Sequence, residues 1–265
     1  MASTFRKYAR IWRVLVLNSF KTQVATWLAS AGYLLGKILR FGFFLAYLLG
    51  IFKHIPNLKG YSMPEVVLFF MTFNLVDVGA QFLFRGLYGV KVLIEEGDFD
   101  KILTQPAHAL FRISVMGMDL LDLLTLIPIG GVTVWALTKL PHAVSGQSVL
   151  MYLVLIANAM LMAYAFHVMI GALSVKTQEM EGAIWIYRDL MTLGRFPINI
   201  YSEMMRGLFV TVLPIGVMVS FPSEALLGLL SWKGLLYACL LGGFFHLAAQ
   251  GFWRQALRNY TSIST

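Results

Sequence analysis

Long uncharged apolar stretches constrain this sequence more than any other feature. Residues 149–173 contain no charged side chain over 25 positions, and residues 234–253 contain none over 20 positions. A helix rises about 1.5 Å per residue, so about 20 apolar residues cross a hydrocarbon layer of roughly 30 Å. Only 13% of the 265 residues are charged, against about a quarter in a soluble domain. The sequence therefore predicts an all-α polytopic membrane protein and excludes a soluble fold, a disordered chain and a disulfide scaffold.

Three further stretches are apolar enough to cross a membrane. Residues 63–84 and 116–137 are each interrupted by two acidic residues, and a first crossing over 38–52 is lengthened at its start by residues 25–35. Basic side chains near that start, on Lys37 and Arg40, are long enough to reach the lipid headgroups.

The region before the last apolar stretch has two interpretations. Residues 207–223 are uncharged but contain Pro214 and Pro222, and the preceding residues 183–200 are only partly apolar. Either residues 207–223 cross the membrane, or residues 183–200 cross it and residues 207–223 form a re-entrant hairpin buried in protein. Both interpretations predict six transmembrane helices.

The positions of Lys and Arg predict the orientation of the chain. With both termini in the cytoplasm, 17 of the 21 basic residues lie inside, and Lys53, Lys59, Lys139 and Lys233 lie outside. If the region after Asp189 faces outward instead, the split becomes 15 to 6. Both arrangements obey the positive-inside rule, so we expect both termini to be cytoplasmic.

The first residues predict an amphipathic helix. Large apolar residues recur there at helical spacing with Arg and Lys between them: Phe5, Tyr8, Ile11, Trp12 and Leu15. This pattern is typical of a basic helix that lies along the inner membrane surface. The alternative is a positive anchor that only orients the first crossing. No cleaved signal peptide is expected, because no short apolar core with a small-residue cleavage site is present.

No pattern for catalysis or metal binding stands out. Segments outside the crossings reach only about thirty residues, whereas a catalytic domain needs roughly 100. Residues 32–37 (GYLLGK) lack the spacing and the Ser or Thr of a P-loop, and their glycines are more typical of a helix-packing face. His167 and His246 are expected to be satisfied core residues, and the single cysteine, Cys239, excludes a thiolate cluster. We expect no enzyme activity, bound cofactor, metal or nucleic-acid partner for this chain.

A polar stripe follows one face of the second crossing. Four polar residues are spaced three, four and four positions apart: Asn74, Asp77, Gln81 and Arg85. A carboxylate at this depth must face the bundle interior, a partner subunit or a water-filled path. The stripe fits helix packing with a paired Asp77, and it also fits a substrate path or a subunit interface. Asp119 and Asp122 of the next crossing are plausible partners for Arg85 or Arg112.

The segment between the second and third crossings predicts a short helix. Gly97 is a helix stop, and Asp98 can then N-cap a helix over residues 99–104 that ends before Pro106. The helix has an apolar side that needs cover, but its acidity disfavours the negatively charged inner leaflet. A groove on another protein is therefore the expected partner.

These residues resemble a known family. Residues 60–106 (GYSMPEVVLFFMTFNLVDVGAQFLFRGLYGVKVLIEEGDFDKILTQP) resemble the permease subunits of type-2 ABC transporters. The most similar subgroup contains bacterial permeases of about this length that are encoded separately from their ATPase. Residues 193–201 (LGRFPINIY), 213–228 (LPIGVMVSFPSEALLG) and 253–265 (WRQALRNYTSIST) extend the resemblance over nearly the whole chain.

The resemblance implies a single permease domain over residues 1–265 with both ends inside. It implies a connector helix over residues 3–22, a cytoplasmic coupling loop over 92–105 that docks on an ATPase, and a re-entrant region over 196–228. Within the loop, seven residues would mediate coupling: Glu95, Glu96, Asp98, Phe99, Asp100, Ile102 and Leu103. Six residues would line the substrate path or an interface: Asn74, Asp77, Gln81, Arg85, Asp119 and Asp122.

The resemblance therefore implies the membrane half of an ATP-driven exporter in the bacterial inner membrane. A second permease copy or a related permease would complete the pathway within the lipid. ATP and Mg²⁺ would bind to separate ABC ATPase subunits rather than to this chain. Two other classes stay open: a membrane scaffold or assembly subunit that transports nothing, and a proton-coupled carrier that uses Asp77, Asp119 and Asp122.

Overall fold

The computed structural model describes residues 2–177 and 182–261, and this part of the chain folds into helices joined by short connections. Within it, five helices are long and apolar enough to cross a membrane: α2 (Trp27–Phe52), α3 with its continuation (Met63–Glu95), α7 (Leu120–Thr138), α8 (Gly146–Thr177) and α12 (Trp232–Arg258). A bent pair before the last span, Glu203–Thr211 and Gly216–Leu226, raises the number to six if it is counted as one span. The predicted all-α membrane fold, with a broken region before the last helix, is confirmed. The last four residues of the segment 253–265 lie outside the described residues.

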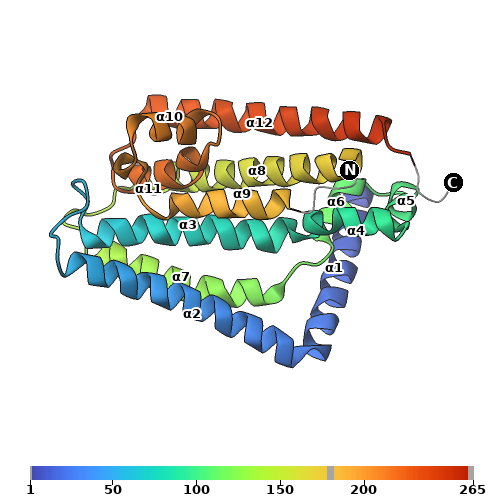
Figure 1. The fold of residues 1–265 in the computed structure, drawn as a ribbon, viewed down its shortest axis with the longest axis horizontal. Helices are drawn as coiled ribbons and strands as arrows, with labels where there is room; N and C mark the ends of the chain where they lie inside the picture. Colours follow the sequence, from blue (N-terminus) through green and yellow to red (C-terminus); the bar gives the residue numbers. More distant parts are fainter. Residues whose placement is uncertain (1, 178–181, 262–265) are drawn as a thin grey trace.

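The long helices run side by side, and the two ends of the bundle differ (Figure 1). Helix α1 (Ala2–Ala25) lies across one end and contacts α6 (Ala109–Val115); the short helix α5 (Asp98–Leu103) and the last turns of α12 lie at the same end. We call this the terminal end. Helices α10 (Glu203–Thr211) and α11 (Phe221–Leu226) lie at the opposite end. Helix α1 therefore includes residues 3–22, which were predicted as a connector helix. It is inclined to the bundle, as a helix at a membrane surface would be.

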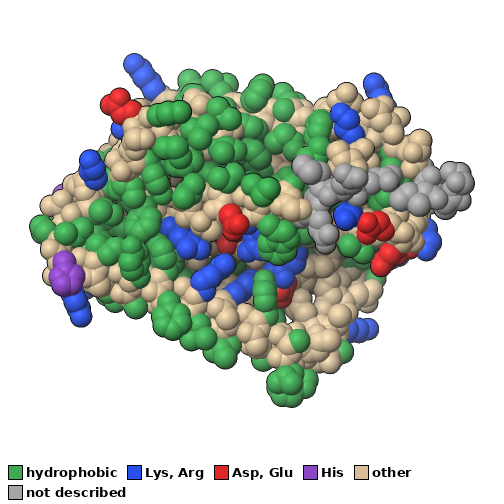
Figure 2. Space-filling model, viewed as in Figure 1, with side chains coloured by type: hydrophobic (Ala, Val, Ile, Leu, Met, Phe, Trp, Pro, Cys, Tyr) green, Lys and Arg blue, Asp and Glu red, His purple; other side chains and the backbone are tan. Residues whose placement is uncertain are grey.

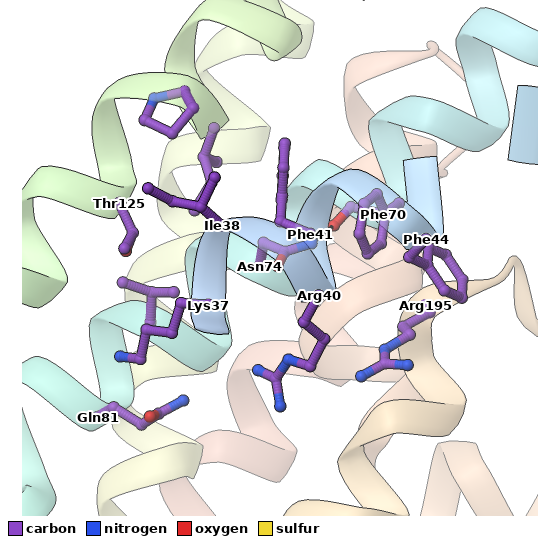
Figure 3. A pocket seen from close by; sticks show the side chains of 13 residues that line it. Lys37, Ile38, Arg40, Phe41, Phe44, Phe70, Asn74, Gln81, Thr125 and Arg195 are labelled. Atoms are coloured by element: carbon purple, nitrogen blue, oxygen red, sulfur yellow. Dashed lines mark hydrogen bonds between the residues drawn. The ribbon is translucent and has the colours of Figure 1, made fainter. Parts of the chain in front are cut away.

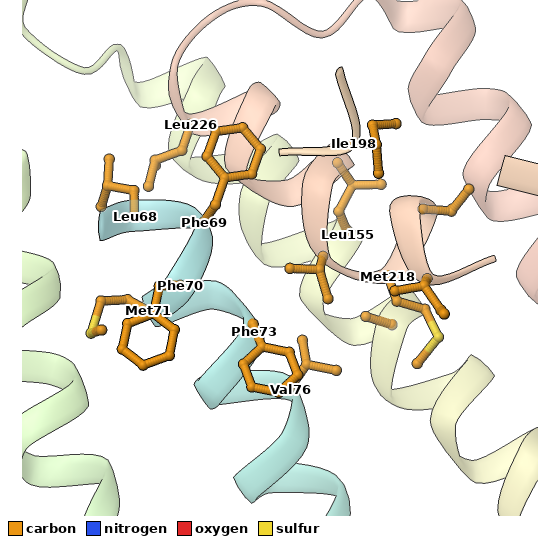
Figure 4. Close-up of a cluster of buried hydrophobic side chains, with 14 of the residues drawn as sticks. Leu68, Phe69, Phe70, Met71, Phe73, Val76, Leu155, Ile198, Met218 and Leu226 are labelled. Carbon is orange, nitrogen blue, oxygen red and sulfur yellow. The ribbon is translucent and has the colours of Figure 1, made fainter. Parts of the chain in front are cut away.

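The core is built around α3, because the part of this helix before Asn74 is apolar on nearly every side. Residues 66–73 of α3 are all buried, and a helix that is apolar all round belongs in the interior. Figure 4 shows its side chains interleaved with those of neighbouring segments, among them Leu155 of α8, Met218 and Leu226. The resulting core holds α3, α8 and the bent region together.

Helix α2 is held much more loosely than α3. Leu48 is its one buried residue. Its ring contacts come from the second half, where the Phe44 ring lies 4.4 Å from the ring of Phe70 on α3. The first half diverges from α3 toward the terminal end (Figure 1). An apolar helix with so little cover needs lipid or a second protein along its exposed face.

The third predicted crossing, residues 116–137, starts later than expected. Helix α6 ends at Val115, the chain turns through Gly117 at a φ of 76°, and α7 begins at Leu120. A positive φ favours glycine, because it has no Cβ to clash. The Asp119 carboxylate caps α7 by accepting a hydrogen bond from the Leu121 N–H at 3.0 Å. Asp119 therefore lies at the start of the span rather than inside it.

Residues 183–223, for which the sequence allowed two interpretations, form several short helices rather than one straight span. Helix α9 (Ala183–Met191) has only 9 residues, which rise about 14 Å. Two short 3₁₀ turns, Thr192–Arg195 and Ile198–Ile200, continue it toward the opposite end. The following helix pair stays there and bends by 79°. This arrangement favours the interpretation in which residues 183–200 pass between the two ends.

We predict that Gly242 is required for the contact between α8 and α12, the most extensive helix pair. The buried Asn158 of α8 donates a hydrogen bond to the Ala238 carbonyl of α12 at 2.9 Å. A Cβ at Gly242 would collide with the Asn158 side chain. Gly242→Ala should therefore lower the free energy of unfolding by about 1–3 kcal/mol. Thermal unfolding of the purified protein in detergent measures the loss.

The matched control is Gly243→Ala on the same helix. No atom lies within 4 Å of a Cβ at Gly243, so this variant should keep the wild-type unfolding temperature or raise it slightly. Equal unfolding temperatures for the two variants would contradict the prediction.

Candidate functional site

A cavity of about 530 Å³ lies between α2, α3 and α9. The wall combines basic, acidic, aromatic and small residues: Gly32, Tyr33, Gly36, Lys37, Arg40, Phe73, Asp77, Trp185, Arg188, Asp189, Thr192 and Arg195. In the space-filling view, charged side chains gather in a recess that apolar side chains surround (Figure 2). The cavity therefore carries six charged side chains, although α2 and α3 are candidate membrane helices.

Helical spacing brings these residues to one wall. On α2, Tyr33, Gly36, Lys37 and Arg40 follow each other at intervals of three, one and three positions. The same intervals separate the residues that α9 and the following turn contribute, from Trp185 to Thr192. Residues at such spacing share one helical face. Two faces of the same pattern thus line the cavity from opposite sides.

The two glycines of residues 32–37 line this cavity rather than pack inside the chain. No atom of the described residues lies within 4 Å of a Cβ at Gly32 or Gly36. The helix-packing face predicted for them is therefore not used against another part of the described chain. Their lack of side chains leaves the cavity wide at this point.

A second, smaller cavity of about 60 Å³ adjoins the first one. Figure 3 shows its aromatic wall, with Phe41, Phe44 and Phe70, and shows Arg40 and Arg195 beside it. Lys37, Arg40 and Arg195 line both cavities. These three basic groups therefore stand where the two cavities meet, beside the aromatic wall of the smaller one.

The predicted polar stripe of α3 follows the two cavities over three of its four residues. Asn74 and Gln81 line the small cavity, and Asp77 lines the large one. The Gln81 Nε2 group donates a hydrogen bond to Asp77 Oδ2 at 2.8 Å, and Arg40 Nη2 lies 3.9 Å from the same oxygen. The Asn74 amide donates to the Phe70 carbonyl at 2.7 Å. Asp77 is thus both paired and on a cavity wall.

The fourth residue of the stripe, Arg85, belongs to a separate ionic network. Its Nη1 lies 2.7 Å from Asp119 Oδ2, and its Nη2 lies 2.6 Å from Asp122 Oδ2. Lys37 of α2 forms a salt bridge to the other oxygen of the fully buried Asp122. Of the two partners considered for the acidic pair, Arg85 is the one that binds it. Two cations and two carboxylates give the network no net charge, and they tie α2, α3 and α7 together.

Lys37 does not reach for the lipid headgroups as its position in the sequence suggested. Its side chain is only 12% exposed, because it turns inward to Asp122. The Arg40 side chain is 55% exposed. Burial of a lysine requires an opposite charge, and the acidic pair supplies it. The sequence shows the charges on both helices but not that these helices approach each other.

Arg195 was missed as a site residue. Its guanidinium lies over the rings of Phe44 and Phe73, at 5.1 and 5.3 Å from their centroids, which is cation–π geometry. Its Nε atom is buried and has no hydrogen-bond partner among the described residues. Arg188 stacks on Trp185 at 5.3 Å. The signal for both was the presence of charges in the partly apolar residues 183–200, a pattern that equally fits an uncertain crossing.

The second candidate region lies at the terminal end, where α4 (Val90–Glu95) meets α5. Gly97 has a φ of 72° and ends the first helix, as predicted. The cap assigned to Asp98 was wrong, because Asp98 is the first residue of α5 and Gly97 precedes it. The Asp98 carboxylate instead accepts a hydrogen bond from Lys101 Nζ at 2.6 Å, which raises the pKa of Lys101.

The apolar side of α5 is covered by the chain itself. Phe99 and Ile102 are buried, and the Phe99 ring lies 6.3 Å from Trp253 of α12 and 5.1 Å from Tyr260. The expectation that another protein must cover this side was wrong, because the end of the chain folds over it. Glu95 and Glu96 are exposed, as is Leu103. The exposed acidic residues of this region are therefore Glu95 and Glu96, which immediately precede α5, whereas α5 itself exposes Lys101 and Leu103.

Helix α1 is attached to the same region. The Tyr8 hydroxyl accepts a hydrogen bond from the His108 N–H at 3.2 Å, and its ring packs edge-on against Phe111 at 4.8 Å. Lys7 donates to the Pro106 carbonyl. The first helix, the loop after α5 and the last helix thus form one contact region at the terminal end.

His167 is a satisfied core residue, as predicted. Its Nδ1 lies 2.6 Å from the Ala163 carbonyl, and its Nε2 lies 3.2 Å from the Tyr88 hydroxyl. The Nδ1 of His246 is buried without a hydrogen-bond partner among the described residues, and its ring stacks on Tyr164. The prediction therefore holds for His167 but not for His246.

Residues 38–264 match the model of a family described as "ABC-2 family transporter protein". The matched range contains most of the cavity wall, the ionic network except Lys37, and the α4–α5 region. No curated protein was found to match the chain.

We predict that Arg85 is required to stabilise the ionic network. Arg85→Gln should leave Asp119 and Asp122 with Lys37 as the only cation in the network. Breaking one side of a buried pair typically costs about 3–5 kcal/mol, because the other charge is left unpaired. Thermal unfolding in detergent measures the effect.

The double variant Arg85→Gln with Asp119→Asn restores the charge balance and tests the cause. The double variant should be more stable than Arg85→Gln alone, although it too lacks the ion pairs of Arg85 with Asp119 and Asp122. A double variant less stable than the single one would argue against charge imbalance as the origin of the loss.

We also predict that the main role of Phe99 is to stabilise the terminal end by packing inside the chain. Phe99→Ala should remove a fully buried ring and destabilise the terminal end by about 3–5 kcal/mol. Leu103→Ala, on the exposed part of the same helix, should change the stability by only about 0.5 kcal/mol. Hydrogen exchange of the last turn of α12 reports the difference, and equal protection in the two variants would contradict it.

Proposed function

The chain belongs to the ABC-2 family of transporter proteins, and from this membership we propose that it forms the membrane pathway of an ATP-driven exporter. The family consists of multi-pass membrane permeases without catalytic activity of their own, and it implies ATPase partners. In our proposal, ATP and Mg²⁺ bind to separate ATPase subunits. A second copy of the chain, or a related permease, completes the pathway. Export as the direction is taken from the resemblance to bacterial exporters.

The observation that carries the coupling role is the exposed acidic surface where α4 meets α5. Glu95 and Glu96 are exposed, whereas Phe99 and Ile102 are buried against the chain's own helices. An ATPase would therefore bind the acidic edge of this region, within residues 92–105. The buried pair, with Asp98, Asp100 and Leu103 around it, would keep the edge rigid.

Two connections would carry motion from this edge into the bundle. Helix α4 continues α3, which runs without a long break from Met63 to Glu95 and lines both cavities. Phe99 contacts Trp253 on α12. A push on α5 by the ATPase would thus move α3 and α12 together and bias the cavity between two states. The connector helix over residues 3–22, attached through Tyr8, would move with them.

The pathway itself would follow the cavity side of α3. Asn74, Asp77 and Gln81 line its walls. Arg85, Asp119 and Asp122 would act as a clamp that holds α2 near the terminal end. The exposed face of α2 supports a permease interface on this side. The re-entrant region over residues 196–228 would then close the pathway at the opposite end.

We assign the terminal end to the cytoplasm of a bacterial cell, with both termini inside. The loops that hold Lys53 and Lys139, and the start of α12 with Lys233, lie at the opposite end (Figure 1). Arg206 of α10 also lies there, in keeping with the 15-to-6 split for that residue. Basic residues of α1 and of the α4–α6 region gather at the terminal end, as the positive-inside rule requires.

The coupling role is tested by charge reversal at the acidic edge. The wild-type chain, tagged and purified from its own cells, should bring an ABC ATPase with it. The purified complex should hydrolyse ATP. Glu95→Arg with Glu96→Arg should reduce the recovered ATPase by about tenfold or more, because like charges across an interface cost several kcal/mol. Recovered ATPase per permease and hydrolysis per complex are the two measurements.

Glu203→Arg is the matched control, because Glu203 is also an exposed acidic residue but lies on α10 at the opposite end. It should leave the recovered ATPase unchanged. Wild-type recovery of ATPase and hydrolysis with the double reversal would remove the coupling assignment.

A further inference from the structure

We propose that the cavity between α2, α3 and α9 binds the anionic headgroup of an amphiphile, a molecule that joins a phosphate, sulfate or carboxylate to an apolar chain. This inference rests on the proposed function, since it names the class of cargo for the same pathway. The inference is argued from three arginines on the cavity wall: Arg40, Arg188 and Arg195.

The charges of the wall do not cancel. Lys37 is neutralised within the ionic network by Asp122. Among the residues that the structure describes, the three arginines share the wall with only two other carboxylates, Asp77 and the exposed Asp189. Unpaired charge is expensive among membrane helices, so a wall with excess positive charge points to an anion as its partner.

The pairing is weakest at Arg195. Arg40 lies 3.9 Å from Asp77, but no carboxylate among the described residues forms an ion pair with Arg188 or Arg195. Both stack on aromatic rings instead. The Nε of Arg195 also has no acceptor among the described residues. A guanidinium held flat by rings keeps its donors fixed for an incoming acceptor.

The geometry suits one anionic group between two arginines. Arg40 and Arg195 both line the two cavities, and Figure 3 shows both side chains extending to the same side of the aromatic wall. Two such cations repel each other unless a negative charge lies near both. Each guanidinium has a fork of donors that fits a phosphate, sulfate or carboxylate with two hydrogen bonds. The arrangement therefore favours a headgroup with at least two oxygens.

The surroundings favour an apolar chain on the same molecule. The small cavity next to Arg40 and Arg195 is walled by Phe41, Phe44 and Phe70. Outside it, α2 and α9 expose large apolar side chains, such as Phe43 at 72% and Ile186 at 63%. The large cavity, at about 530 Å³, is within the range of sites for small organic ligands. A free inorganic ion would use the arginines but none of this apolar surface.

The test measures lipid selectivity in the full chain without its ATPase. The purified permease is reconstituted into phosphatidylcholine vesicles with a trace of spin-labelled phosphatidylglycerol or spin-labelled phosphatidylcholine. The motionally restricted fraction of each label reports association with the protein. We expect the phosphatidylglycerol label to associate preferentially. Arg40→Gln with Arg195→Gln should reduce that preference by about tenfold, the loss expected for charge-assisted hydrogen bonds.

Two control variants separate the cavity from the protein surface and from folding. Arg254→Gln with Arg258→Gln removes the same charge from exposed positions at the end of α12 and should keep the preference. Arg40→Lys with Arg195→Lys retains the charge and should keep a reduced preference in a protein that elutes as wild type. Equal loss in the α12 control and the cavity variant would overturn the proposal, as would equal association of the two lipids with the wild type.

Inorganic phosphate distinguishes the two sources of the same chemistry. If millimolar phosphate leaves the phosphatidylglycerol label associated, the apolar chain contributes to binding, as we propose. Displacement of the label by phosphate at the same ionic strength would overturn the assignment of an amphiphile as the ligand and would indicate a site for free anions. Because this assay contains no ATPase, it can fail while the coupling test succeeds, and the reverse is also possible.

Discussion

The cost of placing charge among membrane helices is the constraint on which this structure depends. The chain meets it in two ways. In the network of Lys37, Arg85, Asp119 and Asp122, two cations and two carboxylates from three helices cancel. In the adjacent cavity Arg40 lies near Asp77, but aromatic rings rather than carboxylates hold Arg188 and Arg195 among the described residues. The first arrangement supports the fold, and the second leaves a chemical preference for an anion.

The helices divide into a firmly packed group and one loosely held member. Helix α3 is largely buried apart from its cavity face, and α8 and α12 pack closely where Gly242 meets Asn158. Helix α2 has one buried residue and is held by ring contacts in one half and by the ionic network in the other. The cavity lies where the loose helix leaves the firm group. A small movement of α3 relative to α2 would therefore change its shape, and the α4–α5 region at the end of α3 is where such a movement would begin.

Much of the fold could be predicted from local pattern. The uncharged runs became α8 and α12, Gly97 ended a helix through its left-handed backbone, and Asp119 and Asp122 met Arg85. The site was only partly predictable. The sequence marked Asp77 and the acidic edge at Glu95, but it missed Arg40 and Arg195, because their meeting depends on how α2 and the turn after α9 are placed around α3.

The sequence by itself determined that this is a helical membrane chain, where most of its helices begin and end, and which of its charges had to find partners, because these follow from length, hydropathy and turn chemistry. Tertiary structure alone decided which partners they found. Phe99, expected to face another protein, is covered by the last helix, and Lys37, expected to reach the headgroups, turns inward to a carboxylate on α7. The physical reason is that burial and ion pairing depend on distances between helices far apart in the chain, which no local pattern encodes.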